Sequence, residues 1–191
     1  MPMHVRVTTI QLRSRLRLRS DEGFGLIELM IAMTVLAVGI LALFAMFESG
    51  IRSITRASTV TTAGALADKE MENFRAIRYV DIGLPDNLVT AAAASAAPYS
   101  SDTAYKSTAG TAAGTRVALA ACGTSPCSTK VPVQTLTGAD GRSYRVDTYV
   151  TWEAVTSGRL VKRVTIVVRE ASNPTRTWAR TASAFDQSTG T

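Results

Sequence analysis

A long apolar run dominates the amino-terminal quarter of the sequence. Residues 24–47 are apolar or uncharged except for Glu28. As a helix, these 24 residues would measure roughly 36 Å, and the hydrocarbon core of a bilayer is about 30 Å thick. The pattern therefore predicts a membrane-spanning helix over residues 24–47.

A different periodicity follows the apolar run. Apolar residues recur at intervals of mostly three or four between polar and charged ones, and these are Ile51, Ile54, Ala57, Ala63, Ala67, Met71, Phe74 and Ile77. This spacing predicts an amphipathic helix within 48–82 that continues to about Tyr79. Its end is expected before Pro85, because the residue before a proline is pushed out of the helical region.

Small and polar residues then replace the helical pattern. Residues 90–114 are mostly Ala, Ser, Thr and Gly, so 83–115 is expected to be a flexible loop. This loop would be either an exposed connector or a variable surface loop that contacts a neighbour or a ligand.

Residues 116–191 show the alternation of a sheet. Tyr144, Val146, Thr148, Val150 and Trp152 would lie on one side of a strand, with Arg145, Asp147, Tyr149, Thr151 and Glu153 on the other. Turn signals at 140–141, 157–158 and 173–174 separate strands at about 131–136, 160–170 and 176–185. The prediction is an α+β fold with an antiparallel meander of about four strands, in which Trp152, Val164, Ile166, Val168 and Trp178 face the amphipathic helix.

The residues at the start of the apolar run resemble a known processing site. Gly23-Phe24-Gly25-Leu26-Ile27-Glu28 is similar to the junction of type IV prepilins and pseudopilins. The resemblance implies cleavage after Gly23 by a prepilin peptidase, N-methylation of Phe24, and Glu28 as the fifth mature residue. Gly25 departs from the usual Thr or Ser at the second mature position. The resemblance also implies the ladle-shaped pilin architecture.

Two further segments resemble minor pilins of the PilV-like type. They are residues 38–43 (VGILAL) and 65–72 (ALADKEME), and the apolar helix lacks the proline that many major pilins carry.

The position of Glu28 calls for a partner. A carboxylate in a spanning helix costs on the order of 2.5 kcal/mol or more at the bilayer centre and less near the interface. Cleavage at Gly23 would leave a cationic amino terminus on Phe24, either in the same chain or in a neighbour, and the attraction would be strong in apolar surroundings. The alternative is an ordinary signal anchor with an incidental acid.

Basic residues precede the junction and set the expected orientation. The leader, residues 1–23, carries Arg6, Arg13, Arg15, Arg17 and Arg19 against Asp21 and Glu22. Positive-inside bias predicts a cytoplasmic amino terminus and an extracytoplasmic carboxyl-terminal domain. The competing reading is a secretory signal cleaved near Ala42 and Ala45.

Half of the net charge of +6 has the same source, because the leader holds five of the 21 basic residues and two of the 15 acidic ones. A nucleic-acid role is disfavoured, since the remaining arginines are scattered and form no binding motif. Arg52, Arg56, Arg75 and Arg78 are expected to be solvated helix surface.

Two cysteines, Cys122 and Cys127, enclose Gly-Thr-Ser-Pro. Outside the cytoplasm a local disulfide is the simplest interpretation, and it would contribute only about 2 kcal/mol. Free thiols are the alternative. A metal site is disfavoured because His4, the sole histidine, lies in the leader.

Catalytic chemistry finds no support in the sequence. There is no nucleophile motif, phosphate loop or dinucleotide fingerprint, and Asp68, Glu70 and Glu72 are expected to be solvated. The sequence predicts a minor type IV pilin that needs no cofactor and is located finally in a pilus or on the cell surface. Its expected partners are prepilin peptidase, major and other minor pilins, an inner-membrane assembly platform and membrane lipid. The alternatives are a pseudopilin of a type II secretion or competence system, and a membrane-anchored binding domain that never polymerises.

Overall fold

The computed structural model describes residues 25–120, 130–155 and 158–187. The chain divides into two compact units, Met1–Ser49 and Gly50–Thr191. Each unit is described by itself below.

Helix α1, Leu26–Arg75, supplies the described structure of the first unit and the first element of the second. The expectation of a helix to about Tyr79 was wrong by one turn. Arg78 is extended, and a short 3-10 helix, η1, follows at Tyr79–Asp81. The ammonium of Lys162 donates to the carbonyls of Tyr79 and Ile82, both at 2.8 Å. A side chain from the sheet thus binds the backbone just beyond the end of the helix.

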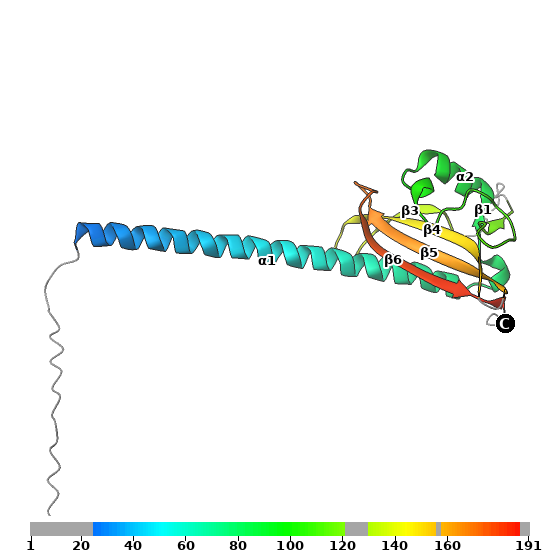
Figure 1. Cartoon of the computed structure of the whole chain (residues 1–191), viewed down its shortest axis with the longest axis horizontal. Helices are drawn as coiled ribbons and strands as arrows, with labels where there is room; N and C mark the ends of the chain where they lie inside the picture. Colours follow the sequence, from blue (N-terminus) through cyan, green and yellow to red (C-terminus); the bar gives the residue numbers. More distant parts are fainter. Residues whose placement is uncertain (1–24, 121–129, 156–157, 188–191) are drawn as a thin grey trace, which may run out of the picture. The chain divides into compact units, whose positions relative to one another are not determined.

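Four antiparallel strands form the sheet of the second unit in the order β3-β4-β5-β6, which confirms the predicted meander (Figure 1). The strands are β3 (Val133–Thr137), β4 (Ser143–Ala154), β5 (Leu160–Glu170) and β6 (Thr177–Phe185). Gly141 has φ 74° in the turn between β3 and β4, a backbone conformation that glycine adopts without steric cost.

One face of the sheet packs against residues 59–74 of α1. Val164, Ile166 and Val168 are fully buried there, as predicted, and form one core with Ala63, Ala67, Met71 and Phe74. Trp152 and Trp178 pack against the same core while staying partly exposed. The buried stripe begins at Thr59, so Ile51 and Ile54, which the periodicity assigned to the apolar face, are exposed.

The segment expected to be a loop, 83–115, contains regular structure. Helix α2 spans Asp86–Ser95, a second 3-10 helix, η2, spans Tyr99–Ser101, and β1 (Leu84–Pro85) pairs in parallel with β2 (Ala118–Leu119). Four consecutive alanines, 91–94, give this stretch high helix propensity, and Val89 and Ala92 bury one side of α2. The expectation of a flexible loop is therefore corrected.

These elements cover the second face of the sheet. Tyr99 stacks on Tyr149 with ring centroids 4.6 Å apart, and its hydroxyl donates to the carbonyl of Thr148 at 2.9 Å. Figure 1 shows strands β3 to β6 between the second half of α1 and α2. The sheet is consequently the middle layer of three.

Candidate processing and assembly segment

The described part of the chain begins next to the predicted cleavage junction. Gly23 and Phe24 lie outside the described residues. The carbonyl of Gly25 accepts hydrogen bonds from the amides of Glu28 and Leu29, at 2.9 and 3.1 Å. Glu28 thus lies in the first turn of α1, where the positive end of the helix dipole favours a carboxylate.

The apolar side chains that follow Glu28 in α1 are exposed. Every residue from Leu26 to Phe47 is exposed, including large side chains such as Leu36 at 63% and Phe44 at 67%. By length and composition the helix could cross a membrane, and none of its most apolar 18-residue window is buried. An apolar surface of this length in water indicates contact with lipid or with other chains.

Comparison with known proteins identifies this segment. Residues 18–44 match the prokaryotic N-terminal methylation motif. No curated protein and no solved structure matched the chain.

The motif covers Gly23, Phe24 and Glu28, so the chain carries a type IV prepilin-like signal. This signal indicates a structural protein of the pilin or pseudopilin type, and it implies in general processing by a prepilin peptidase and pilin partners. Together, the prepilin-like motif and the apolar helix indicate a membrane-anchored protein. The long helix on a four-stranded antiparallel sheet is the α+β architecture of pilins, as predicted.

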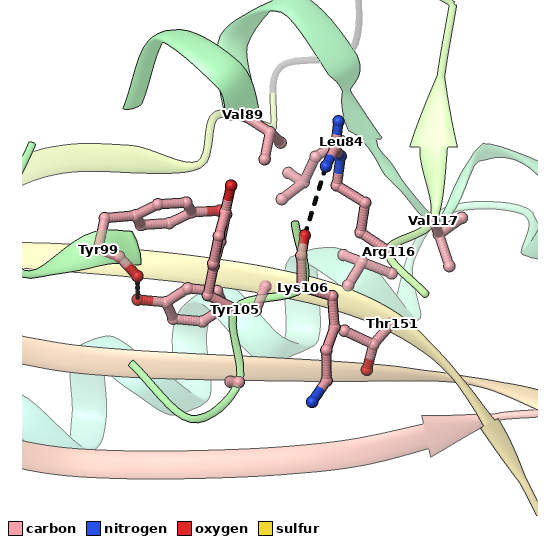
Figure 2. A pocket seen from close by; sticks show the side chains of 11 residues that line it. Leu84, Val89, Tyr99, Tyr105, Lys106, Arg116, Val117 and Thr151 are labelled. Atoms are coloured by element: carbon pink, nitrogen blue, oxygen red, sulfur yellow. Dashed lines mark hydrogen bonds between the residues drawn. The ribbon is translucent and has the colours of Figure 1, made fainter. Parts of the chain in front are cut away.

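A small cavity lies in the second unit between α2, the 99–106 segment and β4. Figure 2 shows Tyr99, Tyr105, Lys106 and Arg116 around it. Its volume of about 10 Å³ is at the lower limit for one water molecule. Arg116 is also occupied, because it donates to Asp86 Oδ1 at 2.9 and 2.6 Å. This cavity is a packing feature and not a ligand site.

A buried charge cluster holds the covering segment to the sheet, and sequence reasoning missed it. Asp147 accepts from Arg145 at 2.7 Å and from Arg169 at 2.8 Å, and Arg169 also donates to Asp102. Arg145 further donates to the carbonyls of Ala96 and Ala97, both at 2.8 Å. We call Arg145, Asp147, Arg169 and Asp102 the buried charge cluster.

Hydrogen bonds and opposite charges in and around the cluster shift the pKa values of two of its members, Arg169 and Asp102. Burial acts to lower the pKa of the Arg169 guanidinium, but the hydrogen bond to Asp147, the charge of Asp147 and the interactions with Tyr149 together outweigh burial and raise that pKa. Burial acts to raise the pKa of the Asp102 carboxyl. Hydrogen bonds from Arg180 and the Ala104 amide, together with the charges of Arg180 and Arg169, outweigh burial, so that pKa lies below its usual value. The charged forms of Arg169 and Asp102 are thus favoured, and every member of the cluster has a hydrogen-bond partner. Paired arginines on adjacent strands, Arg145 opposite Arg169, were the available signal that an acid had to lie between them.

The cysteine pair and a possible metal site were also considered in the sequence. Cys122 and Cys127 lie outside the described residues. Within 25–120, 130–155 and 158–187, no group of three or more metal-ligating side chains occurs.

Glu70, expected to be solvated, is buried on the sheet-facing side of α1, which corrects that expectation. Lys130 lies in the same region, 5.3 Å from the Phe74 ring centroid. Burial lowers the pKa of its ammonium, and the charge of Glu70 partly opposes this effect.

Proposed function

We propose that this chain is a minor type IV pilin whose precursor is cut after Gly23 and methylated on the new amino group of Phe24. One observation carries the proposal. The methylation motif at 18–44 runs directly into a helix whose apolar side chains are exposed through Phe47. Such a helix requires lipid before assembly and other apolar helices after it, which is what a fibre core provides.

Glu28 is the proposed assembly residue. After cleavage, the ammonium of Phe24 would lie within a few residues of this carboxylate, in the same chain or in a neighbour. In a poorly screened apolar environment the two charges attract far more strongly than in water. Entry into the fibre would therefore depend on one ion pair, which sets the position of each subunit.

The proposed route follows from charge and hydropathy. The basic leader stays in the cytoplasm, the helix spans the membrane, and the domain from about residue 50 onward is extracytoplasmic. The assembly platform then moves the subunit into a pilus together with major and minor pilins. The resemblance of residues 38–43 and 65–72 to PilV-like minor pilins supports this role over that of a secretion or competence pseudopilin.

The amino terminus of the membrane-extracted protein tests the proposal. We expect intact-mass and terminal-peptide mass spectrometry to find a chain that begins at N-methylated Phe24, and only in cells that contain the prepilin peptidase. A retained leader in such cells would favour a simple signal anchor. A start beyond about Ala45 would indicate ordinary secretion.

A substitution at the junction tests recognition directly. We expect Gly23→Phe to leave the leader attached, because a peptidase that cuts after glycine has no room for a ring there. Gly25→Ser is the matched control and should still be processed. Efficient trimming of Gly23→Phe would contradict the proposed cleavage site.

A further inference from the structure

We propose that an arginine-lined cleft at the start of the second unit binds the phosphate headgroups of the membrane from which the helix emerges. This inference rests on the proposed function, since it requires a membrane-anchored precursor. We define the arginine cleft by Arg52, Arg56, Arg142, Arg176 and Trp178.

The cleft is built from four separate parts of the unit. Residues of α1 from Ile51 to Thr59 form one wall, Arg142 comes from the β3–β4 turn, and Glu170 is the last residue of β5. Arg176 lies directly before β6, and Trp178 is the second residue of that strand. Its volume is about 340 Å³, which is large enough to admit a phosphate group. Ile51 is 64% exposed and adds an apolar surface beside the arginines.

The charge of the lining is strongly positive. Four arginines and one carboxylate, Glu170, are among the residues that line the cleft, and Glu170 pairs with Arg176 at 3.5 Å. Arg142 contacts Thr59 at 3.3 Å and Asp140 at 3.9 Å, both at the long end for such contacts. More than half of the Arg142 and Arg176 side chains stays exposed, at 54% and 56%. These guanidiniums retain donors for an oxyanion, and guanidinium geometry suits phosphate.

The position along the chain favours a lipid surface over another ligand. Arg52 follows the last residue of the apolar run, Phe47, by only five positions, or roughly 7.5 Å of helix rise. Trp178, with Arg176 4.5 Å from its ring centroid, adds the amphipathic aromatic that is enriched at membrane interfaces. Apolar, aromatic and basic side chains therefore meet around Ile51–Thr59, the part of α1 that follows the apolar run within a few residues.

Tryptophan fluorescence can test the contact in the full chain. The sequence contains two tryptophans, and they lie near opposite ends of β5. Trp152 pairs with Lys162, whereas Trp178 lines a hollow with Glu170. Eight residues of strand separate these positions, or roughly 26 Å. In the Trp152→Phe variant Trp178 is the remaining tryptophan, so the fluorescence reports on the cleft. In the matched control, Trp178→Phe, the fluorescence comes from Trp152, away from the cleft.

The experiment places the full chain in nanodiscs that carry a spin label on the lipid headgroup. We expect the label to quench Trp178 more strongly in discs that contain phosphatidylglycerol than in phosphatidylcholine alone, while Trp152 is unaffected. Arg142→Gln with Arg176→Gln should lower the ratio of docked to undocked cleft on the order of 30-fold. Arg78→Gln with Arg159→Gln, two exposed arginines elsewhere in the unit, should leave it unchanged.

Each of the following results would overturn the inference. Equal quenching of the two tryptophans, or quenching that survives the cleft double variant, removes the lipid contact. Shielding of Trp178 that depends on the number of chains per disc, and not on lipid charge, identifies the cleft as an interface between copies. If the chain does not co-elute with discs of any composition, both this inference and the proposed membrane anchor are wrong. If the chain co-elutes but Trp178 is not quenched, this inference alone is wrong.

Discussion

Asp147 illustrates how single residues hold the second unit together. Its carboxylate is fully buried and lies between two guanidiniums, those of Arg145 and Arg169. Either arginine would be costly to bury without this acid, since breaking a buried ion pair leaves an uncompensated charge. The segment that covers this face depends on the same cluster through Arg145 and the carbonyls of Ala96 and Ala97.

We therefore expect Asp147→Asn to lower the free energy of unfolding by about 3–5 kcal/mol. Urea unfolding of the full chain in detergent, followed by tryptophan fluorescence, measures the effect. Asp81→Asn is the control, because its pair with Arg78 is exposed and should be worth less than about 1 kcal/mol. Equal effects of the two variants would contradict a stabilising role for the cluster.

Asp102 should make stability depend on pH. Burial acts to raise the pKa of its carboxyl, but the hydrogen bonds from Arg180 and Ala104 and the charges of Arg180 and Arg169 together outweigh this effect, so the folded pKa lies below 3.8. A depressed folded pKa stabilises the fold above the unfolded pKa, and this stabilisation is lost as pH falls through the folded value. Asp102→Asn should thus be less stable than wild type at pH 7 and lose less stability below about pH 4. Parallel urea midpoints from pH 7 downward would refute this assignment.

At the scale of elements, a close approach joins α1 to the β3–β4 turn. A Cβ placed on Gly138 would lie 2.5 Å from Thr62 Cγ2 and 2.7 Å from Tyr144 Cε2. Tyr144 is itself held there, because its hydroxyl donates to Asp140 at 2.6 Å. Burial and this hydrogen bond raise the pKa of Tyr144 to about 12. Glycine at 138 therefore lets the helix pack directly on the turn.

Two glycine substitutions should have opposite effects on stability. Gly138→Ala forces the helix and the turn apart, and we expect it to destabilise the unit by about 1–3 kcal/mol. Gly64→Ala lies within α1, where an added Cβ meets nothing within 4 Å, so it should stabilise by about 1 kcal/mol through helix propensity. Urea midpoints of both variants provide the measurement. A destabilising Gly64→Ala would mean that residue 64 is packed more tightly than this structure shows.

At the scale of the whole molecule, the two units have different requirements. Gly50–Thr191 has a core of its own. The apolar residues from Leu26 to Phe47 have no covering within the described residues, so they need a bilayer or a fibre. Folding and assembly are therefore separable, and a variant can be defective in one while the other is intact.

The Glu28→Ala variant should separate assembly from folding. We expect normal cleavage and a normally folded domain, but at least about tenfold less protein in sheared pili, because a charge pair in apolar surroundings is lost. Glu48→Ala is the matched control, a carboxylate on the same helix outside the motif. Unchanged incorporation of Glu28→Ala would count against the pilin proposal and favour an anchored domain that does not polymerise.

Local patterns by themselves determined much of this protein. The apolar run, the methylation motif, the helix that follows and the antiparallel meander were all readable, because each depends on residues close together in the sequence. Val164, Ile166 and Val168 were assigned to the helix-facing side for the same reason, since strand alternation is a property of neighbours.

Only the tertiary structure decided what covers the other side of the sheet. Alternation separated Arg145, Asp147 and Tyr149 from the apolar face but did not reveal that α2 and η2 bury them, nor that Glu70 is buried on α1. The contacts responsible join residues far apart in the chain, such as Asp102 with Arg169 and Tyr99 with Tyr149. Asp147 has one partner two residues away, Arg145, but Arg169 and Asp102 complete the cluster from distant segments. Buried charges need such partners, and no local spacing identifies the distant ones.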